Sequence, residues 1–479
     1  MFPPFSTEIA EKYSHEFMTQ LKNGSPLSDI NGMFGILVCA CDDLKKTDAK
    51  DDCIQPAFEN EYVVLRAFSG QYNSKWNYEG FVPALVEQNQ YDKIVAVNDR
   101  RIHELSVVPE DETQEEKQNR DAERLRLCNE TLSKIYSLYK FTCADGMVRD
   151  FDYLQKEIKF QSGTEKEKLL PTGTGDCCAP KLLSYAFSKN LIPVSMTEFY
   201  WGKSNLRCKQ GVFYPPCDEK CRLILPSILG LEILYRDDDI IVVDKPSGLL
   251  AVPGRGEDKQ DCIVSRVRRL FPDTIEQPSV HRLDMDTSGL MVLAFTADAQ
   301  RKLSMQFEQG KVNKKYIAVL DGALVRPGEK AGQDGSVVKF RNVEFGKSRS
   351  QDDGASGSSC VDEGRLELKF RLDVDNRPHQ IYDPVYGKTG ITLWRRLQIW
   401  KYRNRDVTSV EFTPLTGRTH QLRLAASDVH GFGIAIVGDN LYGHQDEGQR
   451  LLLHSTYISF EHPTTGKRME FTCEPDFKY

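Results

Sequence analysis

The sequence lacks any long apolar run. Its 479 residues are 40% hydrophobic and 28% charged, and no stretch approaches the roughly 20 apolar residues that span a bilayer. The first residues carry Glu8 and Glu11 and no basic segment followed by an apolar core, so neither a secretory signal nor an Arg-rich transit peptide is indicated. We therefore expect a cytoplasmic protein with two or three domains and no membrane partner.

The motifs of several large enzyme classes are also missing. There is no GxxxxGK[ST] loop, no HExxH helix and no convincing GxGxxG loop, which argues against nucleotide hydrolysis, zinc proteolysis and dinucleotide redox chemistry. The zinc deaminase signature is absent as well, because the spacing from Cys217 to Cys221 is one residue longer than Cys-x-x-Cys. We expect no small-molecule cofactor.

Regularly spaced cysteine pairs are missing too, although the chain has 13 cysteines. An odd number without the short repeats of a disulfide scaffold is typical of free thiols in a reducing compartment. Cys177, Cys178, Cys208, Cys217 and Cys221 lie close together in the sequence, and four of them would suffice for a zinc site. Adjacent residues such as Cys177 and Cys178 cannot easily bind one ion, so we expect inert cysteines and no metal.

The chain also lacks the net positive charge of many nucleic-acid-binding proteins. Its formal net charge is −7, and residues 231–479 hold 35 Lys and Arg against 36 Asp and Glu, so six of the seven negative charges lie in residues 1–230. Basic clusters occur at 266–269, 311–315 and 395–405. Such clusters are either solvated faces or parts of a groove for phosphates, and the residues alone favour neither.

The N-terminal part reads as an accessory region. Residues 1–108 alternate short apolar runs with Gly, Asn and Asp turns, which indicates a small α+β or β-rich unit. A charge-dense segment then leads into spaced Leu and Ile residues, which predicts a long helical arm at about 109–140. We expect an α+β accessory region over residues 1–230. An alternative is that this region is a separate enzymatic or metal-binding module.

The character of the sequence changes near residue 230. Residues 231–254 read as two β-rich runs around an Asp-rich turn, followed by Lys245-Pro-Ser-Gly248, where Pro and Gly fix a bend. Ser, Gly and Asp dominate much of the segment from about 325 to 362, which predicts a mobile surface loop. A second domain is therefore expected over residues 231–479.

One carboxylate in this second domain stands out. Asp284 lies in a polar loop that enters an apolar strand running from Leu290 to Phe295. An isolated Asp in such a loop most often caps a turn by accepting a backbone N–H. The complete string, His281-Arg-Leu-Asp-x-x-Thr-Ser-Gly-Leu290, is more specific. It closely resembles the active-site motif of the RluA-type RNA pseudouridine synthases.

Two further segments carry the same resemblance, in the expected order. Lys-x-Tyr-x-Ala around Tyr316 matches the place where family members have an active-site tyrosine, although a lone strand Tyr is more often a half-buried aromatic. The string from Thr416 to Arg423, TGRTHQLR, reads as a Thr-Gly turn whose following helix carries Arg418, His420, Gln421 and Arg423 in its first turn. The resemblance covers the C-terminal half of the chain only.

The resemblance implies both a fold and an activity. The fold is an α+β pseudouridine synthase domain with a mixed, mainly antiparallel sheet over residues 231–479. The activity is the isomerisation of specific uridines to pseudouridine in structured ribosomal or transfer RNA, by a monomer whose partner is RNA. The alternative is an RNA-binding or ribosome-assembly factor that keeps the synthase fold without needing turnover.

Site roles follow from the resemblance together with side-chain chemistry. Asp284 is the expected nucleophile for an extruded uridine, because a carboxylate can form and release a covalent intermediate. Arg423 would pair with Asp284 through its planar guanidinium, and Tyr316 would stack on the uracil. The residues expected to contact RNA phosphates and bases are Arg282, Arg418, His420 and Gln421.

Overall fold

The computed structural model describes residues 5, 7–23, 31–40, 53, 55–56, 62–109, 111–155, 170–217, 219–256, 259–325 and 362–479. The chain divides into two compact units, the first ending at Ile233 and the second running from Leu234 to Tyr479. The sequence placed this boundary near residue 230. The mobile loop expected at about 325–362 falls on residues 326–361, which lie outside the described residues.

The first unit is built on a five-stranded antiparallel sheet in the order β2-β3-β1-β6-β7. Its elements are, in chain order, α1 (Glu8–Lys22), β1 (Gly32–Ala40), β2 (Gln55–Pro56), β3 (Tyr62–Phe68), α2 (Gln88–Glu104), α3 (Gln114–Tyr136), β4 (Lys140–Thr142), β5 (Val148–Asp150), α5 (Cys178–Ser188), β6 (Ile192–Trp201), β7 (Phe213–Tyr214) and α6 (Cys221–Leu229).

Helices cover both faces of this sheet because successive side chains of a strand point to opposite sides. Phe34 and Ile36 of β1 pack in one apolar cluster with α1. The residue between them, Gly35, faces α5, where an added Cβ would lie 2.6 Å from Cβ of Cys178. The expectation of an α+β accessory region is thus met by a sheet between two helices.

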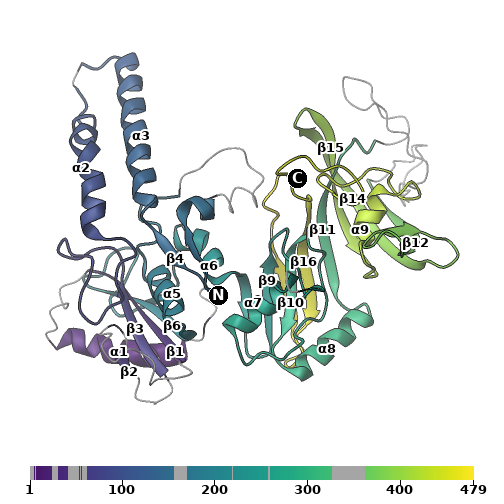
Figure 1. Cartoon of the computed structure of the whole chain (residues 1–479), viewed down its shortest axis with the longest axis horizontal. Helices are drawn as coiled ribbons and strands as arrows, with labels where there is room; N and C mark the ends of the chain where they lie inside the picture. The colour runs from purple at the N-terminus through teal and green to yellow at the C-terminus, as the bar shows by residue number, and fades with distance from the viewer. Residues whose placement is uncertain are drawn as a thin grey trace, which may run out of the picture. The chain divides into compact units, whose positions relative to one another are not determined.

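A pair of helices projects from this sheet, with α2 and α3 side by side (Figure 1). The sequence predicted one helical arm at about 109–140, and α3 lies within that range. It begins with a capping box formed by Thr113 and Glu116. The partner helix α2 was not expected. None of its residues is fully buried, although Tyr91, Ile94, Val95 and Ile102 form a half-buried stripe at helical spacing, and its Arg101 pairs with Glu123 of α3 at 3.0 Å.

The second unit holds a ten-stranded sheet in the order β13-β12-β14-β15-β11-β16-β10-β9-β8, with β17 paired to β16. Its elements are β8 (Glu232–Arg236), β9 (Ile240–Lys245), α7 (Ile263–Leu270), β10 (Ser288–Ala294), α8 (Ala297–Glu308), β11 (Asn313–Leu320), β12 (Glu363–Leu372), β13 (Gln380–Tyr382), β14 (Lys388–Tyr402), β15 (Arg405–Pro414), α9 (Gln421–Ser427), β16 (Leu453–Glu461) and β17 (Arg468–Thr472).

The predicted mixed, mainly antiparallel sheet is confirmed. Among the described strands of this unit only β10 and β16 pair in parallel. They meet where β10 begins, at Gly289, whose φ of 111° and contact with the Ser455 backbone exclude a Cβ: an added one would lie 2.4 Å from the Ser455 carbonyl oxygen. None of the described helices combines the length and the apolar character needed to cross a membrane.

Candidate active site

The loop that carries Asp284 is fixed from behind by the Lys245-Pro-Ser-Gly248 turn. Lys245 is fully buried, and its Nζ donates to the carbonyl oxygens of Pro246, Leu249 and Met285 at 2.7–2.8 Å. Burial lowers the pKa of this ammonium to about 7. Because Met285 directly follows Asp284, the lysine sets where the loop backbone lies.

Two more contacts complete this support. Ser247 Oγ donates to the Asp286 carbonyl at 2.6 Å, and the Gly248 amide donates to the Met285 carbonyl at 2.9 Å. On the other side of the loop, His281 accepts the Val292 amide at 3.0 Å and stacks on Phe307. Burial lowers the pKa of His281 to about 3, so its ring is neutral and shapes the loop.

Tyr316 forms a wall of the same site from β11. It is 8% exposed and lies opposite Phe412 of β15, with its hydroxyl bonded to Ser455 of β16. Burial, with a smaller contribution from the charge of Asp284, raises the pKa of Tyr316 to about 12. The hydroxyl therefore stays protonated in any neutral solution.

The loop before α9 differs from the sequence expectation. A helix carrying Arg418 and His420 in its first turn was predicted, but α9 begins only at Gln421. His420 is the N-cap residue and takes the left-handed conformation, with φ of 54°, which costs a non-glycine residue roughly 1–2 kcal/mol. Its ring is held by a 2.8 Å hydrogen bond between Nδ1 and the Tyr442 hydroxyl.

Gln421, expected to contact RNA, is occupied by the protein. Its Oε1 accepts from Thr416 Oγ1 at 2.8 Å and from the Arg418 amide at 3.0 Å. Its Nε2 donates to the Ile391 carbonyl and to Thr392 Oγ1, both at 3.0 Å. With all four hydrogen-bonding positions of its amide used, Gln421 positions the loop rather than reading a base.

Arg423 also differs from the expectation. Its planar fork holds Asp439 instead of Asp284, with Nε to Oδ2 at 2.9 Å and Nη2 to Oδ1 at 2.6 Å. Arg423 is 2% exposed and Asp439 fully buried, so each charge needs the other. The half-buried Asp284 makes no side-chain hydrogen bond within the described part of the chain. Its charge nevertheless acts on Arg423 and helps to raise the pKa of the guanidinium against the effect of burial.

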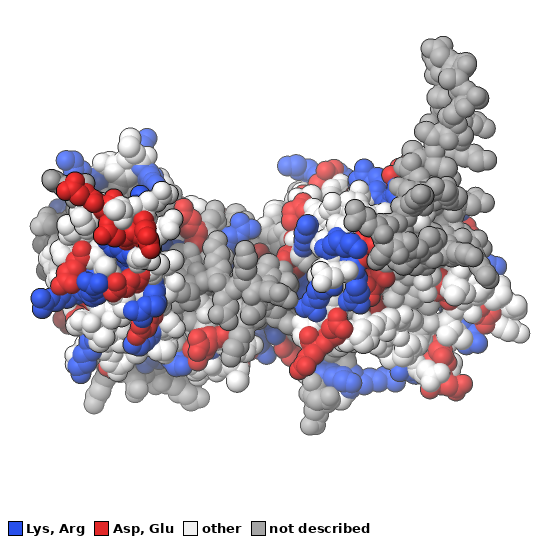
Figure 2. All heavy atoms as spheres, turned by 90° about the horizontal axis from the view of Figure 1, so that it is seen from above, with Lys and Arg blue, Asp and Glu red and all other residues white. Residues whose placement is uncertain are grey.

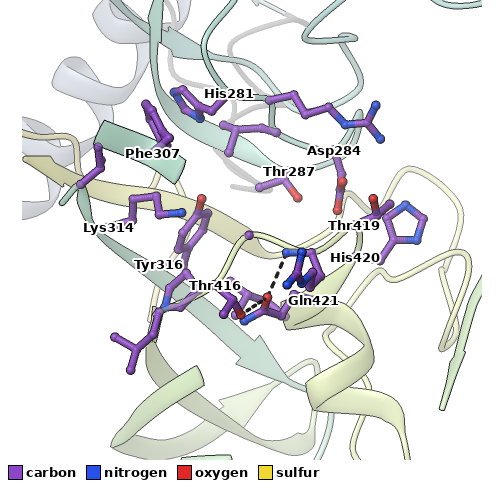
Figure 3. Close-up of a pocket in the computed structure, with 18 of the residues that line it drawn as sticks. His281, Asp284, Thr287, Phe307, Lys314, Tyr316, Thr416, Thr419, His420 and Gln421 are labelled. Carbon is purple, nitrogen blue, oxygen red and sulfur yellow. Dashed lines mark hydrogen bonds between the residues drawn. The ribbon is translucent and has the colours of Figure 1, made fainter. Parts of the chain in front are cut away.

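All seven residues predicted for the site line one cavity of about 770 Å³. The cavity is bounded by the Asp284 loop, the end of α8, β11 and the loop before α9, and Figure 3 shows Asp284 and Tyr316 directed into it. Its volume lies within the range of pockets that enclose small ligands. The negative charge of Asp284 acts on Tyr316, His420 and Arg423, so the carboxylate is their common electrostatic neighbour.

Two further lining residues were not among the site residues predicted from the sequence. Lys314 is half-buried, and burial lowers its pKa. It has no carboxylate partner among the described residues, and its Nζ lies 5.7 Å from the centre of the Phe307 ring. The hydroxyl of Thr287 is buried without a hydrogen-bond partner in the described structure. The ammonium of Lys314 is therefore available to a ligand in the cavity, and Figure 3 labels both residues.

Most members of the basic clusters seen in the sequence are neutralised locally. Lys315 and Arg395 both pair with Glu411, and Arg405 pairs with Asp321 and Asp446. Figure 2 agrees with this, since basic and acidic side chains are interspersed over much of the face that it shows. The exposed Arg282 and Arg418 at the cavity have no carboxylate partner in the described part of the chain, and only Arg418 has a protein contact, from Nε to the Thr389 carbonyl.

Comparisons with known proteins match the part of the chain that holds this site. The family model described as RNA pseudouridylate synthase matches residues 239–428. The dual-specificity RNA pseudouridine synthase RluA of Yersinia pestis is 36% identical over 248 residues, which are 51% of this chain and 99% of that protein. The protein of the same name from Escherichia coli K12 is 34% identical over 255 residues, or 53% of this chain and 96% of that one.

Among solved structures, the human RNA pseudouridylate synthase domain containing 1 is similar over 51% of this chain and 83% of that chain, with 24% identity and a TM-score of 0.36. The curated relatives, in contrast, are matched over nearly their whole length at more than 30% identity. The chain therefore belongs to the RluA-type RNA pseudouridine synthases, a family of isomerases that convert uridine in RNA to pseudouridine.

Proposed function

We propose that the cavity of the second unit takes up one uridine extruded from structured RNA and isomerises it, with Asp284 as the nucleophile. The observation that carries the assignment is the joint lining of one cavity by Asp284, Tyr316 and Arg423, three residues from distant parts of the sequence. A base in a stack is out of reach, so extrusion into such a cavity is required, at a cost of a few kcal/mol.

The chemistry leaves the atomic composition of the nucleotide unchanged, because the hydrogen lost from C5 is balanced by one taken up at N1. The Asp284 carboxylate forms a covalent intermediate, and the C1′–N1 bond of uridine breaks. The released base turns within the cavity, and a bond forms between C1′ and C5. The proton on C5 is lost to solvent, N1 takes up a proton, and the carboxylate is released. Whether the carboxylate first attacks the sugar or C6 of the base, the same oxygen atoms of Asp284 carry the reaction.

Arg423 and Tyr316 prepare the cavity for this step. The guanidinium is held rigid by Asp439, and its positive charge interacts with the negative charge of Asp284. The protonated Tyr316 offers an aromatic face for the uracil and a neutral hydroxyl. We assign Tyr316 to stacking on the uracil. Because its pKa is about 12, its hydroxyl is not a phenolate that could accept a proton in the resting enzyme.

RNA contacts come from the cations at the cavity. Arg282 and Arg418 are exposed, and Lys314 lies inside, so these three supply positive charge where the phosphates of an extruded nucleotide pass. His420 holds its loop through Tyr442 and lines the cavity. The relatives are named dual-specificity RNA pseudouridine synthases, and we assign uridines of ribosomal or transfer RNA to this chain as its substrate class.

The enzyme is further proposed to work as a monomer in the cytoplasm. Every residue that lines the cavity lies between Val280 and Leu453 of one chain, which supports a site complete without a second copy. Seven of the described cysteines are free thiols, which supports a reducing compartment: Cys128, Cys177, Cys178, Cys208, Cys217, Cys221 and Cys262. Light scattering of the purified chain and cell fractionation test the two statements.

The test of function is pseudouridine mapping over all stable RNAs of cells that lack the chain and cells that regain it. Wild type and Asp286→Asn should restore the missing sites, because Asp286 does not line the cavity. Asp284→Asn should restore none, although the protein accumulates normally. Restoration of the sites by Asp284→Asn would contradict the assigned nucleophile, and an unchanged pseudouridine map after removal of the chain would contradict the function.

A further inference from the structure

Three cysteine thiols of the first unit meet at one point. Cys177 is the N-cap residue of α5, Cys217 lies in the segment between β7 and α6, and Cys221 is the first residue of α6. The sulfurs of Cys177 and Cys217 are 3.9 Å apart, and those of Cys217 and Cys221 are 3.5 Å apart. All three sulfurs lie within 4.8 Å of one another, and all three thiols are free.

These separations suit a shared metal ion. Zinc binds thiolate sulfur at about 2.3 Å in a tetrahedral arrangement, so two thiolates on one ion lie about 3.8 Å apart. A disulfide would bring two sulfurs to about 2.05 Å. The arrangement therefore has the spacing of a ligand set, and three soft sulfur donors favour zinc or a similar ion over magnesium or calcium.

We propose that Cys177, Cys217 and Cys221 bind one soft divalent metal ion, zinc foremost, as a three-thiolate site that joins the starts of α5 and α6. The proposal concerns the accessory unit and does not depend on the reaction at Asp284. Cys217 is exposed, so the fourth position of a tetrahedral ion is open to water.

Backbone amides and the starts of two helices lie at the cluster. The backbone amide of Cys221 donates to the Cys217 sulfur at 3.5 Å. The starts of two helices, α5 and α6, bring positive dipole ends to the cluster.

The sequence argument against a metal does not apply to this set. Two adjacent cysteines were considered unable to share an ion, but Cys178 points elsewhere. Its sulfur lies 3.4 Å from the Met33 carbonyl, and its Cβ packs against Gly35 on the sheet. Only Cys177 of the adjacent pair reaches the cluster, and Cys208 is outside it. The third ligand is Cys217, which lies four residues before Cys221. One turn of the chain between them brings their sulfurs to 3.5 Å.

Two other groups of possible ligands occur in the described residues, and internal contacts explain them better. His462 pairs with Asp237 at 2.9 Å, and Cys473 donates to Asp244 at 3.0 Å. Each of these groups mixes a donor with an acceptor, which satisfies both without an ion. The three-thiol cluster, in contrast, contains among the described residues no carboxylate to which a thiol could donate.

The experiment uses the full chain, purified under reducing conditions and then exposed to zinc and desalted. Elemental analysis should find about one zinc per chain, the stoichiometry of a single tetrahedral site. Cys217→Ser and Cys221→Ser should each lose that zinc, whereas the matched control Cys208→Ser should keep it. Zinc retention by both cluster variants, or a wild-type chain that stays metal-free, would overturn the proposal.

A second measurement does not depend on how the variants fold. Cobalt(II) added to the reduced wild-type chain should give sulfur-to-cobalt charge-transfer absorption and the visible bands of tetrahedral cobalt, saturating at about one equivalent. Zinc should then displace the cobalt and abolish the colour. A titration without these bands would refute a thiolate site, as would a native mass two hydrogens too low because a disulfide joins two of the cysteines.

Discussion

At the scale of single residues, a substitution of Lys314 should affect RNA binding without affecting the catalytic step. A buried ammonium without a carboxylate partner in the described structure is available for a phosphate, and a hydrogen bond to a charged group contributes about 1.5–3 kcal/mol. Lys314→Met should therefore weaken RNA binding by roughly tenfold or more. It should also lower the slope of log affinity against log salt concentration by about one, the value for one lost phosphate contact. The rate at saturating RNA should change little.

Lys315→Met is the matched control for this variant. The Lys315 side chain is half-exposed and pairs with Glu411, so its loss should leave RNA affinity nearly unchanged. Filter binding at several salt concentrations measures both variants. Equal losses of affinity in the two would show that Lys314 has no special contact with RNA.

Tyr316 makes a pH-dependent contribution to stability. Its pKa is raised from 10.0 to about 12, so above pH 10 the unfolded chain releases the phenolic proton before the folded one does. The contribution is complete below pH 10 and is lost as the pH rises through 12. Between pH 9 and 11, the wild type should lose roughly 1.4 kcal/mol more stability than Tyr316→Phe. Urea unfolding of both proteins at the two pH values measures this, and parallel losses would contradict the raised pKa.

At the scale of elements, the Arg423–Asp439 pair fastens α9 to the segment that follows it. Asp439 also accepts the amides of Leu441 and Tyr442 at 3.0 Å, so it organises that turn as well. Asp439→Asn leaves the Arg423 charge buried and uncompensated, which should cost about 3–5 kcal/mol. Activity should fall with it, because Arg423 loses its fixed position beside Asp284.

Asp446→Asn is the comparison for Asp439→Asn. Asp446 pairs with Arg405 at 3.3 Å where both side chains are about 40% exposed, and such pairs contribute about 0–1 kcal/mol. Chemical unfolding of both variants against the wild type gives the difference. A loss at Asp439 no larger than the loss at Asp446 would mean that the buried pair does not stabilise α9.

How much the sequence predicts depends on how far apart the interacting residues are. The Asp284, Tyr316 and Arg423 segments could be found because each is a short, fixed motif. The partner of Arg423 could not, since the burial that makes Asp439 its counterion arises only in the folded unit. Lys314 had an available signal, because residues two apart in a strand share a face and Tyr316 was already assigned to the site.

The accessory unit likewise has features that the local sequence indicates and contacts that only folding creates. The strands of the sheet follow from short apolar runs, which the sequence displays, whereas the half-buried stripe of α2 was not recognised among its charged residues. The meeting of Cys177 with Cys217 joins positions 40 residues apart, and no local spacing signals it. Ion pairs such as Lys315 with Glu411 likewise neutralise basic clusters through residues far along the chain.

At the scale of the whole molecule, the second unit should be sufficient for catalysis. It has its own apolar clusters, its residues alone line the cavity, and relatives of about half this length are matched almost completely. A truncated chain of residues 231–479 should fold cooperatively and isomerise the same uridine. Circular dichroism and turnover of that chain test the statement, and an unfolded or inactive product would assign the first unit an essential part in the site.

The central claim, that the Asp284 carboxylate performs the isomerisation, is tested most directly with substrate RNA carrying tritium at C5 of uridine. Forming the C1′–C5 bond expels the hydrogen on C5, so each turnover releases one label to water. Asp284→Asn should bind this RNA as tightly as the wild type and release no tritium above background, while Asp286→Asn should release it at the wild-type rate. Tritium release by Asp284→Asn at a rate near that of the wild type would contradict the account.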